Sequence, residues 1–261
     1  MLNIVIPMAG RGSRFQEVGY ELPKPLIPVH DQPMIRLVIE NLRPAQSHRF
    51  IFLCLAEHLE KYKLAARLAE WAPGCEVVTV DRVTEGAACT VLLARHLIDN
   101  SDPLMIANSD QWVNVSIDQY LETMETEAAD GLIMTMKASD PKWSFVRFDN
   151  AGKVIEVVEK QVVSDEATVG IYNFRHGSAY VEGADRMIAK NLRVNNEFYV
   201  APVYNELIED GASIAIYNVG EENDGMHGLG IPADLNAFLA NPVSQLALAK
   251  GGLAAAGQRS R

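Results

Sequence analysis

In the first half of the chain, short uninterrupted apolar runs alternate with segments in which apolar residues recur at helical spacing. The runs lack polar alternation, so they predict strands that are buried on both faces. We expect these strands at residues 3–7, 50–55, 76–81 and 104–107, and helices at residues 33–42, 57–71, 86–97 and 117–128. Strict alternation of strand and helix predicts βαβ units and a parallel sheet with helices on both faces.

The second half differs because several strands follow one another closely. We expect strands at residues 132–137, 144–148, 154–158, 167–174 and 213–219, and helices at residues 178–190, 202–210 and 232–239. The predicted fold is α/β: a Rossmann-like, doubly wound, mixed but mainly parallel sheet with a small β excursion. With no internal repeat or linker, we expect one domain over residues 1–240 and a partly disordered C-terminal tail over residues 241–261.

The charge balance restricts the partners of the chain. The 23 Lys and Arg residues face 34 Asp and Glu residues, which gives a formal charge of −11. No basic cluster is present, so we expect no nucleic-acid partner. No apolar stretch approaches the length of a membrane span, and no basic residue precedes the apolar start, so we expect a cytoplasmic protein without a membrane partner. A small polyphosphate can bind only where local cations and backbone N–H groups outweigh the global field.

A glycine-rich turn follows the first predicted strand. Gly10 and Gly12 permit positive φ and close backbone approach, so several N–H groups can converge on phosphate oxygens there. No Gly-Lys-Ser/Thr sequence follows, which excludes a Walker A loop, and the third glycine of a dinucleotide fingerprint is missing. The predicted nucleotide contacts of this loop are Met8, Ala9, Gly10, Arg11, Gly12 and Ser13.

Two cations stand close behind this turn. Arg14 can contact phosphate in bidentate fashion, and Lys24 lies in a stiff segment between Pro23 and Pro25. A glycine-rich bend alone is equally typical of an ordinary strand-to-loop turn. The combination of G-x-G-x-R with K-P favours a phosphate site.

This combination resembles the signature of the sugar-phosphate nucleotidyltransferases, or nucleotide-sugar pyrophosphorylases, and the likeness extends to about Leu239. The resemblance implies a nucleotide-diphospho-sugar transferase fold and a reaction in which an acceptor phosphate attacks the α-phosphorus of a nucleoside triphosphate (NTP), releasing pyrophosphate. A phosphate nucleophile is already ionised at neutral pH, so the site must supply positioned cations and a divalent metal rather than a base. We expect Arg14 and Lys24 to act at the α-phosphate and the leaving pyrophosphate.

Asp110 follows the predicted strand 104–107, and the carboxyl ends of strands face the ligand crevice in doubly wound sheets. By position alone it could equally cap the next turn. The resemblance assigns Asp110 as a Mg²⁺ ligand and a catalytic residue, and we expect Asn108 beside it to contact the nucleotide. The family places a second acidic ligand in a D-x-G-T-P-like segment, where this chain has Gly228. His227 and Asp224 are the candidate substitutes; His227 fits a structural role equally well, and the metal could also rely on Asp110 and phosphate oxygens.

Glu85 and Gly86 match the place where the family recognises the base, although Thr84 here also fits a helix N-cap. Glu159 and Lys160 resemble the family's acceptor-binding pair, Glu for hydroxyls and Lys for phosphate. An isolated Glu-Lys pair is more often a solvated strand end, so this prediction depends on its placement before residues 168–172. The other predicted acceptor contacts are Thr168, Gly170 and Asn196.

Asn195, Asn196 and residues 227–230 resemble capsule-associated members of the family, which include cytidylyltransferases acting on phosphorylated glutamine. This favours CTP and a role in capsule or surface polysaccharide precursors. The alternatives are a sugar-1-phosphate uridylyl-, thymidylyl- or guanylyltransferase, and an inactive nucleotide-binding regulatory module, which Gly228 supports. The expected partners are an NTP and a phosphorylated small-molecule acceptor, and the resemblance also allows a homo-oligomer.

Overall fold

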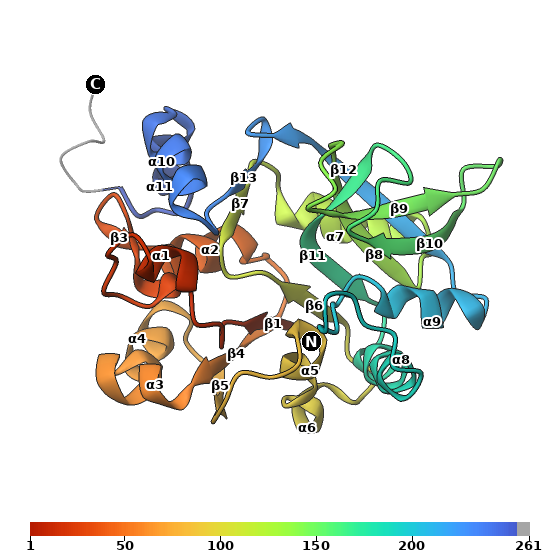
Figure 1. The fold of residues 1–261 in the computed structure, drawn as a ribbon, viewed down its shortest axis with the longest axis horizontal. Coiled ribbons are helices and arrows are strands. Elements are labelled where there is room, and N and C mark those ends of the chain that lie inside the picture. Colours follow the sequence, from red (N-terminus) through yellow and green to blue (C-terminus); the bar gives the residue numbers. More distant parts are fainter. Residues whose placement is uncertain (255–261) are drawn as a thin grey trace.

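The computed structural model describes residues 1–254, which form one large mixed sheet flanked by helices (Figure 1). The main sheet runs in the order β5-β4-β1-β6-β11-β8-β12-β13-β7, and the hairpin of β9 and β10 joins it at β11. The strands are β1 (Leu2–Pro7), β4 (His48–Leu55), β5 (Glu76–Val80), β6 (Leu104–Ala107), β7 (Gln111–Val113), β8 (Gly131–Lys137), β9 (Ser144–Phe148), β10 (Val154–Glu159), β11 (Glu166–Phe174), β12 (Ile214–Glu222) and β13 (Gly225–Gly228). A separate small pair consists of β2 (Pro28–Val29) and β3 (Gln32–Pro33).

The direction of the strands agrees with the predicted fold class. β1 pairs in parallel with β4 and β6, and β4 pairs in parallel with β5. β11 lies antiparallel between β6 and β8, while β12 runs parallel to β8. The prediction of a Rossmann-like, mixed α/β sheet is therefore confirmed.

The helices are shorter than the sequence predicts in two places. They are α1 (Ser13–Gln16), the 3₁₀ helix η1 (Lys24–Leu26), α2 (Met34–Leu42), α3 (Ala56–Tyr62), α4 (Leu64–Trp71), α5 (Ala87–Leu92), α6 (Arg95–Ile98), α7 (Ile117–Thr126), α8 (Gly177–Ala189), α9 (Val203–Glu209), α10 (Pro232–Ala240) and α11 (Val243–Lys250). The predicted helix 57–71 breaks where Lys63 takes a φ of 50°, and the predicted helix 86–97 divides into α5 and α6. Within residues 1–254, no helix is both long and apolar enough to cross a membrane.

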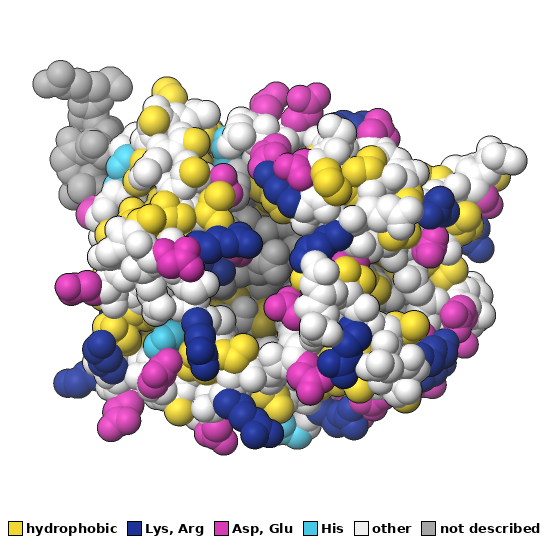
Figure 2. All heavy atoms as spheres, viewed as in Figure 1, with side chains coloured by type: hydrophobic (Ala, Val, Ile, Leu, Met, Phe, Trp, Pro, Cys, Tyr) yellow, Lys and Arg dark blue, Asp and Glu magenta, His cyan; other side chains and the backbone are white. Residues whose placement is uncertain are grey.

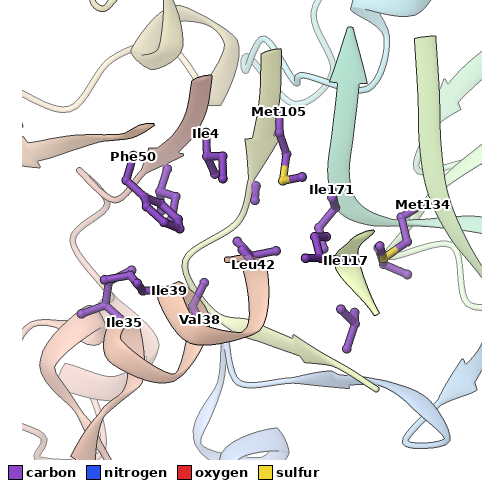
Figure 3. Packing of buried hydrophobic residues seen from close by; sticks show 14 of the residues in the cluster. Ile4, Ile35, Val38, Ile39, Leu42, Phe50, Met105, Ile117, Met134 and Ile171 are labelled. Carbon is purple, nitrogen blue, oxygen red and sulfur yellow. The ribbon is translucent and has the colours of Figure 1, made fainter. Parts of the chain in front are cut away.

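Buried hydrophobic residues lie on both faces of the sheet. Successive side chains of a strand point to opposite faces, so Ile4 and Ile6 of β1 join one buried cluster while Val5 joins another. Figure 3 shows the first cluster, in which Val38 and Leu42 of α2 face the sheet. Each fully buried side chain of this size contributes about 1.5–3 kcal/mol.

A third cluster joins the two ends of the described chain. Phe15 and Ile27 from the N-terminal segment pack with Trp112, Phe238 and Leu248. In Figure 1, the blue helices α10 and α11 lie beside the red N-terminal segment. The region predicted as a tail therefore carries an unpredicted helix, α11, which packs against α2; residues 255–261 of the predicted tail lie outside the described residues. The consequence for the site is that α10 is fixed beside the glycine-rich loop.

Candidate active site

A cleft of about 590 Å³ opens at the carboxyl ends of β1 and β6. Figure 2 shows this face, with a central hollow and Lys and Arg side chains on both sides of it. The residues that line the cleft come from both halves of the chain: Gly12, Ser13, Arg14, Lys24, Asn108, Asp110, Gln111, Lys142, Trp143, Glu159, Lys160, Tyr199, Met226, Gly228, Gly230, Ile231 and Asp234. Among these described residues four side chains are basic and three are acidic, so the cleft is more positive than the acidic chain as a whole.

A second cavity, here called the loop pocket, has a volume of about 350 Å³. It is lined by Pro7, Met8, Ala9, Gly10, Lys24, Pro25, Val83, Thr84, Gly86, Ala87, Thr90, Ser109 and Glu197. Most of its lining residues come from the turn after β1 and from the segment that begins α5. Lys24 lines both cavities.

Lys24 is held at the junction of the two cavities by the loop around it. It begins η1 directly after Pro23, whose φ of −62° and ψ of 146° are extended. Gly12 has a φ of +66°, and a Cβ at this position would lie 3.2 Å from the Lys24 Cβ. Gly12 therefore provides both the left-handed turn and the close approach of the loop to Lys24.

The Lys24 ammonium donates to the Asp110 carboxylate, with Nζ and Oδ2 2.7 Å apart. Both side chains are about one-fifth exposed. An ion pair at such a partly solvated position contributes about 1 kcal/mol or less. Either partner can therefore exchange the other for a bound ligand at small cost.

The predicted nucleotide-binding residues separate into two groups. The structure places Gly12, Ser13 and Asn108 on the cleft wall, together with Arg14, which was predicted as catalytic. Arg11 instead borders a separate depression with Asp81 and Arg82, so its position gives no support to the predicted contact.

Gly86 and Glu85 also differ in their positions. Gly86 lines the loop pocket with a φ of +130°, and a Cβ there would lie 2.4 Å from the Phe198 carbonyl oxygen. Glu85 is two-thirds exposed and forms an ion pair with Arg193 at 3.0 Å, outside both cavities. The alternative interpretation of Thr84 as N-cap is wrong: Gly86 caps α5, and the Thr84 hydroxyl donates to the Gly86 carbonyl.

The predicted acceptor pair closes the other side of the cleft. Lys160 Nζ donates to the Tyr199 hydroxyl at 2.6 Å, and this bond raises the pKa of Lys160. The Glu159 carboxylate accepts from the Ser144 hydroxyl, while burial raises the pKa of Glu159 above its ordinary value. The pair is therefore held by neighbours and is not a solvated strand end.

Three further predicted acceptor residues do not line the cleft. Thr168 is buried and shares a hydrogen bond with the Tyr172 hydroxyl, and Asn196 is exposed outside both cavities. Gly170 lies behind the wall with a φ of +81°, and a Cβ there would be 2.0 Å from Asn108 Nδ2. Gly170 thus makes room for the Asn108 side chain.

Sequence reasoning missed Lys142 and Tyr199; for Trp143 the sequence allowed a wall of the acceptor pocket but favoured a buried strand aromatic. Lys142 lies over the Trp143 ring, 4.8 Å from its centroid, and is anchored by Glu222 at 2.8 Å. The buried Trp143 Nε1 has no hydrogen-bond partner among the described residues. No local sequence signal brings Tyr199 to Lys160, which is 39 residues away.

Neither His227 nor Asp224, the two candidate substitutes for the second metal ligand, lines the cleft. His227 is buried between Trp112 and Phe238, with ring centroids 5.6 and 5.4 Å away, and burial lowers its pKa. Asp224 is exposed and outside the cleft lining. Neither position supports a ligand role.

Asp234, which the sequence analysis did not single out, lies on the cleft wall with Asp110. Its place just after the Gly228–Pro232 segment was the available signal. Within residues 1–254, no group of three or more His, Cys, Asp and Glu side chains is arranged as a metal centre. One or two carboxylates with substrate phosphates are, however, a normal Mg²⁺ arrangement.

Comparison with known proteins gives consistent matches. A profile of the nucleotidyl transferase family matches residues 4–197. The mannose-1-phosphate guanylyltransferase catalytic subunit beta of Danio rerio is 27% identical over 179 residues, which cover 66% of this chain and 49% of that protein. The bifunctional protein GlmU of Cupriavidus metallidurans is 26% identical over 221 residues, covering 82% and 46%. The chain thus spans about half the length of the curated relatives it matches.

Solved structures match over more of their length. The nucleoside-diphosphate-sugar pyrophosphorylase of Vibrio cholerae RC9 superposes with a TM-score of 0.79 at 26% identity, covering 91% of this chain and all of that one. A UDP-glucose pyrophosphorylase complexed with UDP-glucose has a TM-score of 0.72 at 18% identity, covering 91% and 98%, and supports the fold alone. Because the family profile covers more than half of the residues, this chain belongs to the nucleotidyl transferase family.

Proposed function

We propose that the protein transfers a nucleotidyl group from an NTP to the phosphate of a sugar 1-phosphate and releases pyrophosphate. The observation that carries this proposal is the position of Lys24, which lines both the loop pocket and the cleft. A cation at such a junction can contact the nucleotide phosphates while the acceptor phosphate approaches from the cleft. This is the placement that transfer between two polyanions requires.

In the proposed reaction an acceptor phosphate oxygen attacks the α-phosphorus. A new phosphorus–oxygen bond forms, and the bond to the β-phosphate oxygen breaks, with its electron pair leaving on pyrophosphate. The backbone of residues 8–13 holds the triphosphate, and Arg14 and Lys24 stabilise the charge of the leaving group. The acceptor phosphate is ionised at neutral pH, so no residue of the chain has to act as a base.

Magnesium dependence is part of the proposal. Asp110 fits this role because its carboxylate lines the cleft at the end of β6 and has only Lys24 as an ionic partner among the described residues. Hard oxygen ligands of this kind are what Mg²⁺ prefers. When bound, the metal would neutralise phosphate charge and hold the reacting phosphates together.

On the acceptor side, Lys160 is the proposed phosphate contact and Glu159 the proposed hydroxyl contact. The Trp143 ring lines the cleft as an apolar wall, which suits a sugar ring. The names of the compared relatives favour a sugar 1-phosphate acceptor. Their names give no support to CTP, phosphorylated glutamine or capsule precursors, so these stay predictions from sequence resemblance alone.

The test is pyrophosphate release from a panel that combines ATP, CTP, GTP, UTP and dTTP with glucose, mannose and N-acetylglucosamine 1-phosphates, with phosphoglutamine as the non-sugar acceptor. We expect release with one pair at least, and only when Mg²⁺ and the acceptor are both present. NTP binding without release from any pair would favour the inactive binding module instead. Release with CTP and phosphoglutamine alone would replace the sugar acceptor.

A further inference from the structure

The family pattern that this chain resembles has an acidic metal ligand at the position of Gly228. The carboxylate of Asp234 lies beside this glycine. Gly228 has ordinary backbone geometry, and a Cβ there would lie 3.3 Å from the Asp234 Oδ2. The Asp234 carboxyl therefore lies next to the place where an acidic side chain from position 228 would begin. The two positions are six residues apart, so a different element delivers this carboxyl.

That element is α10, and its packing fixes where Asp234 points. Pro232 stands in the first turn of α10, while Leu235 and Phe238 are buried in the cluster that joins the two ends of the described chain. The Ile231 carbonyl accepts from the Leu235 N–H at 3.1 Å. With one face of the helix anchored in this way, Asp234 in the same turn faces the cleft.

Asp110 approaches the same short segment from β6. The Leu229 N–H donates to the Asp110 carbonyl at 2.8 Å, and a Cβ on Gly230 would lie 2.6 Å from the Asp110 Oδ2. The backbone of residues 228–230 thus has the Asp110 carboxylate at one end and the Asp234 carboxylate at the other. Because both positions are glycine, no side chain from residues 228 and 230 comes between these carboxylates.

Asp234 is also the cleft carboxylate without a protein partner. Asp110 is paired with Lys24 and Glu159 with Ser144, whereas Asp234 has no hydrogen bond or ion pair to any residue of the described part of the chain. A partly buried, unpaired carboxylate near a second one is an arrangement that a bound cation stabilises.

We infer that Asp234 is the second protein carboxylate for the divalent metal, supplied from α10 in place of the side chain that position 228 lacks. The inference rests on the proposed function in that the metal is the one required for transfer. It differs from the family pattern in the element that carries the ligand. It also explains why a glycine at position 228 is compatible with a working site.

The test is direct metal binding, measured as the loss of the free Mn²⁺ signal in electron paramagnetic resonance, with Mn²⁺ alone and with inorganic pyrophosphate added. Asp234→Asn and Asp110→Asn should each weaken Mn²⁺ binding at least about tenfold. Asp224→Asn is the matched control because that carboxyl is exposed outside the cleft, and it should leave the affinity unchanged. Circular dichroism of each variant checks that the fold is intact.

A double variant that moves the carboxylate from position 234 to position 228 distinguishes loss of a metal ligand from general damage to the fold. Gly228→Asp combined with Asp234→Asn returns the carboxylate to position 228, and this double variant should recover most of the Mn²⁺ affinity lost in Asp234→Asn. Unchanged affinity in Asp234→Asn, or no saturable binding by the unaltered protein under either condition, overturns the inference. If Asp234→Asn weakens Mn²⁺ binding but the unaltered protein releases no pyrophosphate, this inference stands and the proposed function fails. If the unaltered protein releases pyrophosphate but Asp234→Asn binds Mn²⁺ with unaltered affinity, the proposed function stands and this inference fails.

Discussion

The loop pocket and the β9–β10 side of the cleft are lined by different kinds of residue. The loop pocket is lined mainly by two short segments rich in small residues, residues 7–10 after β1 and Val83, Thr84, Gly86 and Ala87 at the start of α5, with Gly86 at a φ that side chains rarely adopt. The opposite side, near the β9–β10 hairpin, consists of side chains: Lys142, Trp143, Glu159, Lys160 and Tyr199. Lys24 belongs to both sides.

This difference separates what each side can recognise. Small residues let main-chain N–H groups approach a ligand closely, which suits the invariant triphosphate. A wall of side chains changes with each substitution, which suits recognition of an acceptor. The contrast predicts that glycine substitutions damage the nucleotide side, that side-chain substitutions damage the acceptor side, and that Lys24 affects both.

The largest effect is expected from Lys24→Ala, because this residue joins the two sides. We expect kcat to fall by about 10²–10³-fold, the range seen when one charge-stabilising donor is removed from an active site. Pyrophosphate release under saturating substrates measures it. Lys153→Ala, in the exposed hairpin turn, is the control and should retain full activity. A Lys24→Ala enzyme within a few-fold of the unaltered rate would contradict the shared role.

The next effect is expected from Gly86→Ala in the loop pocket. Its φ of 130° and ψ of 171° are essentially restricted to glycine and cost an alanine about 1–3 kcal/mol. The 2.4 Å contact with the Phe198 carbonyl oxygen adds about 1–3 kcal/mol of overpacking. Gly74→Ala is the matched control, since Gly74 has a φ of +80° but no atom within 4 Å of an added Cβ. Urea unfolding should show the larger loss for Gly86→Ala, together with a raised KM for the NTP. Equal losses would mean that the close approach to Phe198 is unimportant.

A smaller effect is expected from Tyr199→Phe on the side-chain side. The hydroxyl that accepts from Lys160 is lost, and a hydrogen bond to a charged group contributes about 1.5–3 kcal/mol. We expect about a tenfold rise in KM for the acceptor, with KM for the NTP unchanged. Tyr62→Phe removes a hydroxyl bonded to the Glu21 carbonyl away from the cleft and should change neither constant. A rise in KM for the NTP instead would contradict the assignment of the acceptor to this side of the cleft and of the NTP to the loop pocket.

The smallest effect is a pH dependence of stability at Glu159. Burial raises the pKa of this carboxyl in the folded protein above its ordinary value of 4.5. The folded state therefore binds the proton more tightly, and stability falls as pH rises from below 4.5 through the folded-state pKa. Glu159→Gln should lack this fall, so its stability relative to the unaltered protein should increase with pH across this window. Urea unfolding over a pH series measures the difference, and a constant difference would contradict it.

The same contrast governs how much could be predicted from the sequence. β1, β4 and β6 are largely apolar and buried, and the loop after β1 carries its own glycines and prolines, so local patterns predict the sheet and the position of Lys24. β5 lies at the sheet edge and is only partly buried, so the prediction that it is buried on both faces is wrong. The acceptor side depends on contacts between distant segments, such as Lys160 with Tyr199. Local patterns contain no information on such pairs.

Two further elements show the same limit. β7 and β13 are short strands that pair antiparallel with each other, Gln111 opposite Gly228, and neither was predicted. Their pairing is what brings the segment of residues 228–230 to Asp110. Asp234 was missed for this reason: its position in the cleft follows from β13 and α10 together and not from its neighbours in sequence.

The most direct test of the central claim is ³¹P nuclear magnetic resonance of the protein with Mg²⁺, an NTP and a sugar 1-phosphate from the active pair. The account predicts that the resonances of both substrates decline together while a sugar-linked diphosphate and pyrophosphate appear in equal amounts. Formation of a nucleoside diphosphate with orthophosphate, or pyrophosphate without the sugar-linked diphosphate, would show hydrolysis instead of transfer. Either result would contradict the account.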